Sequence, residues 1–282
     1  MRARAVVVAE VDDHGKTCLS TLRSAGPLQL RPTPGGLYLV GGAAGPIGGD
    51  DLSLVIEVGP GAALTIHSAA ASVALPGPGG AGQSRMAIEA LVDEGGTLEW
   101  LPEPAVAAGG CWHQVECTIS MARHARLVWR DEVVLGRHHE APGAWASRLS
   151  IDVDGRPLLR QELAVGAPRH SRNDPLCGVM ARVEGESAGW AGPAVSGGSR
   201  ALGSVVMVDP RWEATGPPSA VLSDRGAVLA LVGPGAQVVA LADGAVTLRR
   251  LLDQGLRLLA PSRQLFGPPD GRGVDVVTQA LH

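Results

Sequence analysis

Short runs of alternating apolar and polar residues recur along most of the chain, each after a glycine-rich or polar turn. Three of these runs begin at Gly61, Gly95 and His124, which lie 34 and 29 residues apart. Two more begin at Gly226 and Gly235. Alternation with a period of two is typical of strands with one buried face, and each run follows another strand-like stretch across a short turn. The pattern predicts a mostly β protein assembled from hairpin units.

The regular spacing of the first three runs has two interpretations. Stacked hairpins or an irregular solenoid of sheets would produce it, because each repeated unit then packs on its neighbour. Any all-β chain in which turns precede strands would produce it as well. Both interpretations lead to the same fold class, a single large, mostly β domain of stacked hairpins or sheets over residues 1–282.

A different period appears between residues 245 and 259. Apolar residues recur there every three to four positions beneath three arginines, which is the pattern of an amphipathic helix. We therefore expect one or two helices near the C-terminal end. Segments rich in glycine, proline or serine are expected to be mobile loops, at residues 76–82, 184–200 and in the tail 267–282.

Composition excludes several classes of protein. The 24 basic and 28 acidic residues give a net charge of −4 without a basic stripe, so no nucleic-acid partner is expected. No run approaches the roughly 20 apolar residues of a membrane span, and the short apolar run near the N-terminus is too brief for a secretory signal. These features predict a cytoplasmic protein, with no membrane association, whose four cysteines are thiols.

Signatures of catalysis are scarce. The single lysine does not lie in a Walker-type phosphate loop, and the sequence contains no Gly-x-Ser-x-Gly elbow. The glycines between residues 77 and 82 match a dinucleotide-binding fingerprint, but the adjacent prolines conflict with the strand-turn-helix context that this fingerprint requires.

Soft and borderline metal ligands gather in one part of the chain. If the segment that begins at Cys111 is a strand, then Cys111, His113 and Cys117 share one face, and His138 and His139 follow in a later connection. Thiols and imidazoles suit nickel, zinc or copper. Alternatively, the cysteines pack as small apolar groups, because no closed Cys-x-x-Cys spacing supports a structural metal site.

Two motifs carry the most specific signal. The first is Gly45-Pro46-Ile47-Gly48-Gly49-Asp50-Asp51-Leu52, and the second is Glu99-Trp100-Leu101-Pro102-Glu103, about fifty residues later. A glycine-rich turn that ends in aspartate by itself requires only positive φ angles and a capping side chain, although that side chain could also form a polar wall for a passing cation. The two motifs in this order, followed by Gly136-Arg137 after a further apolar run, resemble the urease accessory protein D family (UreD, also called UreH).

The resemblance covers residues 25–137 and resumes weakly over 238–259. It implies a non-catalytic, chaperone-like β scaffold that binds the urease apoenzyme and an all-helical UreF-like partner, which recruits a UreG-like GTPase. It also implies that nickel passes through an internal tunnel, so transient Ni²⁺ and no tightly bound cofactor are expected. The motif residues that become candidates for this nickel path are Gly48, Gly49, Asp50, Glu99 and Glu103.

Two other functions stay open on the residues alone. A metal-dependent hydrolase would use His113, His138 and His139 as ligands, with Glu103 or Glu140 as a further ligand or base. It predicts tightly bound metal and turnover without partners. A β-solenoid adhesion module predicts export, for which the N-terminal sequence provides no signal.

Overall fold

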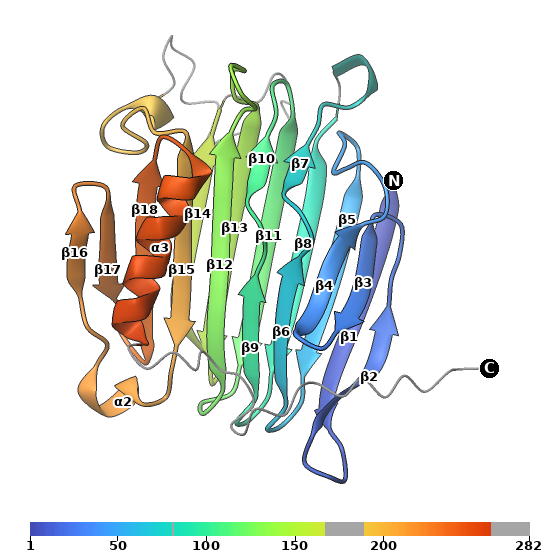
Figure 1. The fold of residues 1–282 in the computed structure, drawn as a ribbon, viewed down its shortest axis with the longest axis vertical. Coiled ribbons are helices and arrows are strands. Elements are labelled where there is room, and N and C mark those ends of the chain that lie inside the picture. The colour runs from blue at the N-terminus through green and yellow to red at the C-terminus, as the bar shows by residue number, and fades with distance from the viewer. Residues whose placement is uncertain (81, 167–188, 261–282) are drawn as a thin grey trace.

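Two large β-sheets lie face to face in the chain (Figure 1). The structure, a computed structural model, describes residues 1–80, 82–166 and 189–260. Sheet A has the strand order β14-β13-β11-β8-β5-β1-β2, and sheet B has the order β16-β17-β18-β15-β12-β9-β6-β4-β3, with β7 and β10 attached beside β12. The prediction of a single, mostly β domain of stacked sheets is confirmed.

Sheet A contains β1 (Arg2–Val11), β2 (Thr17–Arg23), β5 (Asp51–Val58), β8 (Ser84–Val92), β11 (Trp112–Met121), β13 (Ala144–Val153) and β14 (Arg156–Val165). Sheet B contains β3 (Leu28–Thr33), β4 (Gly36–Gly41), β6 (Ala63–Ser68), β7 (Ser72–Ala74), β9 (Thr97–Leu101), β10 (Ala105–Ala107), β12 (Arg126–Leu135), β15 (Ala201–Val208), β16 (Ala220–Ser223), β17 (Gly226–Ala230) and β18 (Gly235–Ala242). The helical elements are α2 (Trp212–Thr215) and α3 (Ala245–Leu259), with short 3₁₀ turns η1 (Pro78–Gly80) and η3 (Gly189–Ala191).

The first three repeated units are not hairpins, because the two strands of each unit belong to opposite sheets. β5 lies in sheet A and β6 in sheet B, and the pairs β8–β9 and β11–β12 divide in the same way. Strands of successive units pair in parallel, so that Ala63 lies opposite Thr97 and Thr97 opposite Arg126. The repeat spacing in the sequence is therefore the pairing register of a short solenoid. The hairpin prediction was wrong here because alternation reports which face of a strand is buried, not which strand pairs with it.

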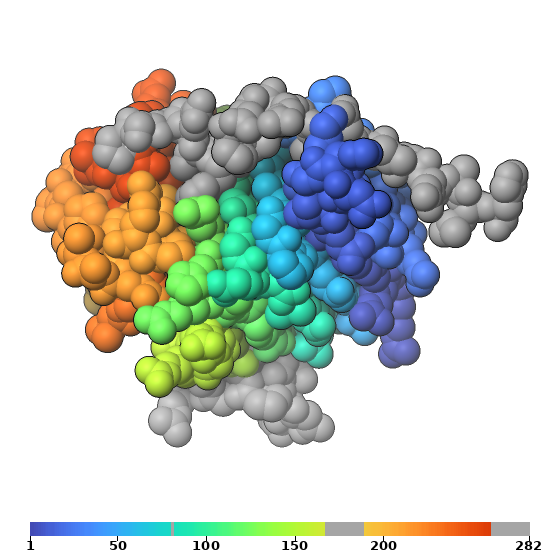
Figure 2. Space-filling model, turned by 90° about the horizontal axis from the view of Figure 1, so that it is seen from below, coloured from blue at the N-terminus to red at the C-terminus, as the bar shows by residue number. Residues whose placement is uncertain are grey.

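The last two units do form a hairpin, in which β17 and β18 pair antiparallel with Val228 opposite Val238. Seen end-on in Figure 2, the units follow one another across the molecule from the N-terminal strands to the C-terminal ones.

Helix α3 spans Ala245–Leu259, the range that its period predicted. It packs on the face of sheet B that points away from sheet A (Figure 1), and its buried residues are Leu248, Leu252, Gly255, Leu256 and Leu259. Val246 is one of the apolar residues that define the period of this segment, and it is nevertheless 67 % exposed. In the parts of the chain that are described, no helix has the length and apolarity to cross a membrane.

Alternate side chains of β12 belong to two different apolar clusters, one between the sheets and one beneath α3. Leu127 and Trp129 belong to this inner core, whereas Val128 belongs to the cluster beneath α3. Each large apolar side chain buried in this way contributes roughly 1.5–3 kcal/mol. The same alternation places Asp131 on the inner face of sheet B, and Arg130 and Glu132 on the face that carries α3.

Two of the expected loops are partly described. Residues 78–80 form the single 3₁₀ turn η1 between β7 and β8. Residues 189–200 form compact turns in which Ser196 N–H donates to the Trp190 carbonyl and the side chains of Ser196 and Ser199 are buried, so this part has more fixed structure than expected. Residues 184–188 and the tail 267–282 lie outside the described residues, and their mobility stays a prediction.

Candidate functional site

A cavity of about 560 Å³ lies between the two sheets. Sheet A contributes apolar and aromatic side chains that include Ile88 and Trp145, and sheet B contributes Trp100 and Trp129. The exposed segment from Ala69 to Ser72 also lines it, so the cavity reaches the surface there. Its ionisable lining residues are Glu103, His113, Cys117, Asp131 and Glu132.

Sheet B is interrupted beside this cavity. β6 and β9 pair as far as His67 and Leu101, and pairing resumes between β7 and β10 at Ser72 and Ala105. The segments between them, 69–71 and 102–104, lie outside the strands, while β12 continues past them as one strand. Prolines at 102 and 104 have no N–H to donate to a ladder, which explains why β9 ends there.

The cavity passes the plane of sheet B at this interruption. Its lining contains Trp129 from the inner face of β12 and Glu132 from the face beneath α3, together with Glu103 from the interrupted segment. The lining of this space therefore includes residues from both faces of β12, and Glu132 is the one on the face that carries α3.

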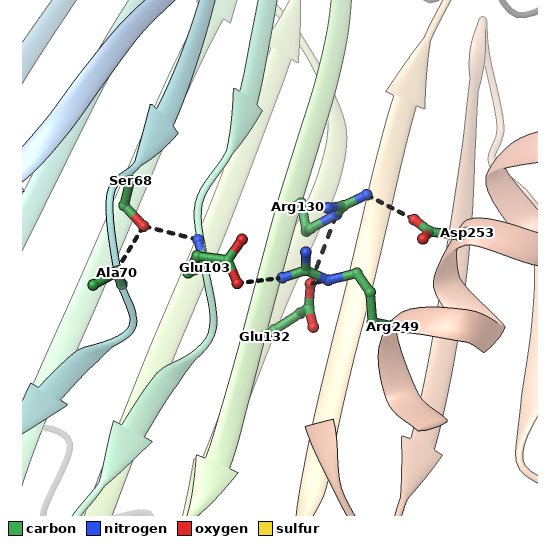
Figure 3. Close-up of polar contacts among 7 residues, drawn as sticks. All are labelled: Ser68, Ala70, Glu103, Arg130, Glu132, Arg249 and Asp253. Carbon is green, nitrogen blue, oxygen red and sulfur yellow. Dashed lines mark hydrogen bonds and ion pairs between the residues drawn. The ribbon is translucent and has the colours of Figure 1, made fainter. Parts of the chain in front are cut away.

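Two arginines and three carboxylates occupy this position (Figure 3). Arg249 Nε lies 2.6 Å from Glu132 Oε1, and Arg249 Nη2 lies 3.5 Å from Glu103 Oε2. Arg130 Nη2 lies 2.9 Å from Asp253 Oδ1, and Arg130 Nε lies 3.7 Å from Glu132 Oε1. β12 provides Arg130 and Glu132, whereas α3 provides Arg249 and Asp253. The network therefore ties α3 to sheet B at the interruption.

Glu132 is the most enclosed member of the network, with 1 % of its side chain exposed. Burial raises the pKa of Glu132, and the charges of Arg249 and Arg130 oppose this rise without cancelling it. Among the described residues, Glu132 Oε2 has no hydrogen-bond partner. Buried polar atoms without a partner are uncommon, and this oxygen retains its capacity to accept a ligand from the cavity.

Asp131, the neighbour of Glu132 on the opposite face, lines two cavities. The second cavity measures about 440 Å³ and lies between β13 and β14 of sheet A and β15, β17 and β18 of sheet B. Burial raises the pKa of Asp131 to about 6. Burial and the nearby Asp131 charge also raise the pKa of the Cys117 thiol. Asp131 is thus the ionisable group that the two cavities share.

Asp50, a predicted path residue, caps the turn before β5. Its Oδ2 accepts the Ile47 N–H at 2.9 Å, and its Oδ1 lies 2.6 Å from the Met1 ammonium. Burial alone would raise the pKa of Asp50, but these two donors outweigh burial and lower it. The structure thus shows the capping role, one of the two roles considered for this aspartate.

Gly48 and Gly49 are each required in this turn for a different structural reason. Gly49 has a φ of 93°, which favours glycine, and a Cβ on Gly48 would lie 2.5 Å from the Gly77 nitrogen. The cavity lining includes Gly45 and Pro46 but not Asp50. The role of Asp50 in a metal path stays a prediction.

Glu99 and Glu103 lie on the same side of sheet B. Glu99 is 5 % exposed, and its Oε2 accepts the Thr65 hydroxyl at 3.1 Å. Glu103 is positioned by its own N–H, which donates to Ser68 Oγ at 2.8 Å. Of the five predicted path residues, Glu103 alone lines the cavity.

The five predicted metal ligands do not form one ligand set. His113 and Cys117 share the inner face of β11 as predicted, and both line the cavity. Cys111 packs with its thiol near the Ala144 carbonyl, whereas His138 and His139 are exposed. Among the described residues, no group of three or more His, Cys, Asp or Glu side chains is arranged to hold a metal ion. The hydrolase alternative therefore has no assembled ligand set in this part of the chain.

His113 has the most strongly perturbed imidazole in the cavity. Its Nδ1 lies 2.8 Å from Ser84 Oγ, and its ring packs against Trp145 with 5.0 Å between centroids. Burial lowers the pKa of His113 to about 4, although the Asp50 charge opposes this. The ring is therefore neutral at pH 7.

Arg130, Glu132 and Arg249 were missed by the sequence analysis. A signal was available, because Arg130-Asp131-Glu132 places three consecutive charges between the apolar runs Leu127–Trp129 and Val133–Leu135 of one strand. Charged residues are rarely buried unless they are paired, so such a run marks a buried network or a site.

Comparison with known proteins supports the resemblance that the two motifs indicated. The model of a family described as UreD urease accessory protein matches residues 1–270. A urease accessory protein UreD of Parafrankia sp. (strain EAN1pec) is 44 % identical over 262 residues, which cover 90 % of this chain and 87 % of the relative. The Streptomyces coelicolor protein of the same name is 42 % identical over 265 residues, covering 92 % and 97 %. The protein of that name in Streptomyces avermitilis is 41 % identical over 264 residues, covering 92 % and 98 %. With a match over nearly its whole length, the chain belongs to the UreD urease accessory protein family.

Proposed function

We propose that the chain is a non-catalytic scaffold of urease maturation, which binds apo-urease and UreF-like and UreG-like partners and passes Ni²⁺ through its interior in the cytoplasm. Membership of the family supports the role in urease maturation. The observation that carries the nickel path is the acid-lined cavity that crosses the plane of sheet B.

The cavity has the chemistry of a relay. Carboxylates of Glu103, Asp131 and Glu132, with the neutral imidazole of His113, offer separate oxygen and nitrogen ligands. Ni²⁺ accepts both kinds of donor, with no soft thiolate site required. A closed set of four ligands would trap the ion, whereas weak and separate ligands allow it to leave.

Asp131 has a central place in this path because both cavities reach it. With a pKa of about 6, its carboxylate is mostly ionised at pH 7 and attracts a cation, and it loses that charge in mild acid. Delivery of nickel is therefore expected to weaken as the pH falls through 6.

Co-expression tests the scaffold and the path separately. The chain would be produced with urease subunits and UreF-like and UreG-like proteins from the same genome, and the complex would be recovered by affinity pull-down. Nickel per urease would be measured for the wild type, for Asp131→Asn and for the exposed control Asp13→Asn. We expect equal complex yields and less nickel only with Asp131→Asn.

Each part of the proposal has its own contrary result. Failure to recover a complex with the wild-type chain would reject the scaffold. A complete nickel load with Asp131→Asn would reject the path through this carboxylate. A purified chain that holds stoichiometric metal and hydrolyses a substrate without partners would favour the hydrolase instead.

A further inference from the structure

Arg249 occupies a position where a metal cation would find its ligands. Its guanidinium lies 2.6 Å from Glu132 and 3.5 Å from Glu103. One carboxylate comes from β12, which continues past the interruption, and the other comes from the interrupted segment after β9; both residues line the cavity. The guanidinium is thus the cation that bridges them.

The carboxylate pair is incompletely satisfied by Arg249. Glu132 has 1 % of its side chain exposed, and its Oε2 has no hydrogen-bond partner among the described residues. A carboxylate has four lone-pair sites, so Glu132 retains acceptor capacity toward the cavity. No described residue of the network satisfies Glu132 Oε2, so this oxygen is available to an external ligand.

Arg249 is able to leave this position without unfolding α3. The helix is held independently by its buried leucines and by the ion pair between Arg130 and Asp253. The Arg249 side chain is 25 % exposed, so solvent already reaches part of it.

We propose that Glu132 and Glu103 form a divalent-cation site that Arg249 masks, and that an incoming cation exchanges with the guanidinium. The identification of Ni²⁺ as the natural occupant rests on the function proposed above. The exchange itself follows because Arg249 and an incoming cation would bind the same two carboxylates. Two cations cannot occupy one carboxylate pair without strong repulsion, so binding of the ion and closure by Arg249 exclude each other. The exchange keeps the buried charge of Glu132 compensated in both states, which avoids the cost of a stranded ion.

Equilibrium dialysis of the full-length chain against Ni²⁺, prepared without a histidine tag, tests the masking. Arg249→Gln is compared with Arg250→Gln, which removes the same charge from the next, exposed position of α3. We expect Arg249→Gln to bind Ni²⁺ on the order of tenfold more tightly, the effect of about 1.4 kcal/mol of removed competition. Arg250→Gln should bind like the wild type.

Two further variants identify the ligand and the masking charge. The double variant Arg249→Gln/Glu132→Gln should lose the gain, and Arg249→Lys, which keeps a positive charge, should stay near the wild-type affinity. A gain that survives Glu132→Gln, or one that Arg249→Lys reproduces in full, would overturn the proposal. So would equal affinities in Arg249→Gln and Arg250→Gln.

Alkylation of cysteines provides a control for folding. Cys111 is 2 % exposed and does not line the cavity, so a variant in which it reacts as slowly as in the wild type has kept its fold. If Arg249→Gln exposes Cys111, the Ni²⁺ affinities of Arg249→Lys and Glu132→Gln are compared with the wild type instead. The proposal then requires Glu132→Gln to bind Ni²⁺ more weakly than the wild type. Tighter Ni²⁺ binding by Arg249→Gln with no change in nickel loaded into urease would uphold the masked site and reject the nickel path.

Discussion

Arg249 on α3 and Glu132 on β12 meet with 2.6 Å between Nε and Oε1, at the point where two strands of sheet B are interrupted. The contact joins the helix to the sheet, and its carboxylate partner Glu132 also lines the cavity. A buried ion pair is weak evidence for stability, since desolvation offsets much of its Coulomb energy. Its position beside an acid-lined cavity is the basis of the cation exchange proposed above.

Replacement of Arg249 should destabilise the fold more than replacement of its neighbour. Arg249→Ala leaves the buried Glu132 with Arg130, whose Nε lies 3.7 Å away, as its remaining ion-pair partner among the described residues. Breaking a buried pair costs about 3–5 kcal/mol, and the partial exposure of Arg249 reduces this to about 2 kcal/mol. Arg250→Ala, at an exposed position, should cost less than about 0.5 kcal/mol. Equal urea midpoints for the two variants would contradict this account.

Asp50→Ala should lower urease activation while the complex with partners still assembles. The carboxylate caps the turn through Ile47 N–H, and its charge opposes the burial that lowers the pKa of His113 in the cavity. Asp51→Ala is the matched control, because its side chain is 61 % exposed and forms one loose pair with Arg2. Urease activity and pull-down yield would be measured together. Loss of assembly, or unchanged activation, would reject a path role for Asp50.

Gly255→Ala tests the contact between α3 and β18. An added Cβ would lie 2.4 Å from Val238 Cγ1, so the helix or the strand has to shift. Overpacking of this kind costs about 1–3 kcal/mol. The double variant Gly255→Ala/Val238→Ala removes the clash and should recover part of that loss in urea unfolding. A single variant as stable as the wild type would show that α3 packs less closely than described.

Asp131 should make stability fall as the pH rises from about 4 to about 6. Its pKa is raised to about 6 in the folded chain from the ordinary 3.8, so over this range the folded state holds more protons than the unfolded state. Protonation therefore favours folding at the acid end, and this contribution is absent above pH 6. Because Asp131 is partly exposed, solvent screening reduces the effect to about 2 kcal/mol.

The measurement for Asp131 is a difference between two chains. Urea midpoints of the wild type and Asp131→Asn would be compared at pH 4.5 and pH 7, so that other carboxylates cancel. The variant should gain stability relative to the wild type at the higher pH. A difference that does not change with pH would show that Asp131 is not buried as a charged group.

Local pattern was sufficient for several features. The spacing of apolar residues between 245 and 259 predicted the bounds of α3. The alternation of side chains along the strand after Cys111 predicted that His113 and Cys117 share one face, and both line the cavity. The spacing between the repeated runs also equals the spacing between paired residues, since Ala63 lies opposite Thr97 and Thr97 opposite Arg126. The hairpin interpretation failed because a turn between two strands has the same sequence signature whether the strands pair with each other or enter opposite sheets.

The sequence by itself determined the buried face of most strands, the helix α3, the capped turn at Asp50 and the membership of the family. The first three features depend on residues that are near one another in the chain. Membership of the family depends on short motifs, and the similarity to known UreD proteins confirms it. Only the tertiary structure decided that Glu103, Glu132 and Arg249 meet, and that Asp131 connects two cavities. Side chains from separate elements converge only after the strands have paired, because pairing and helix docking set their distances and periodicity does not.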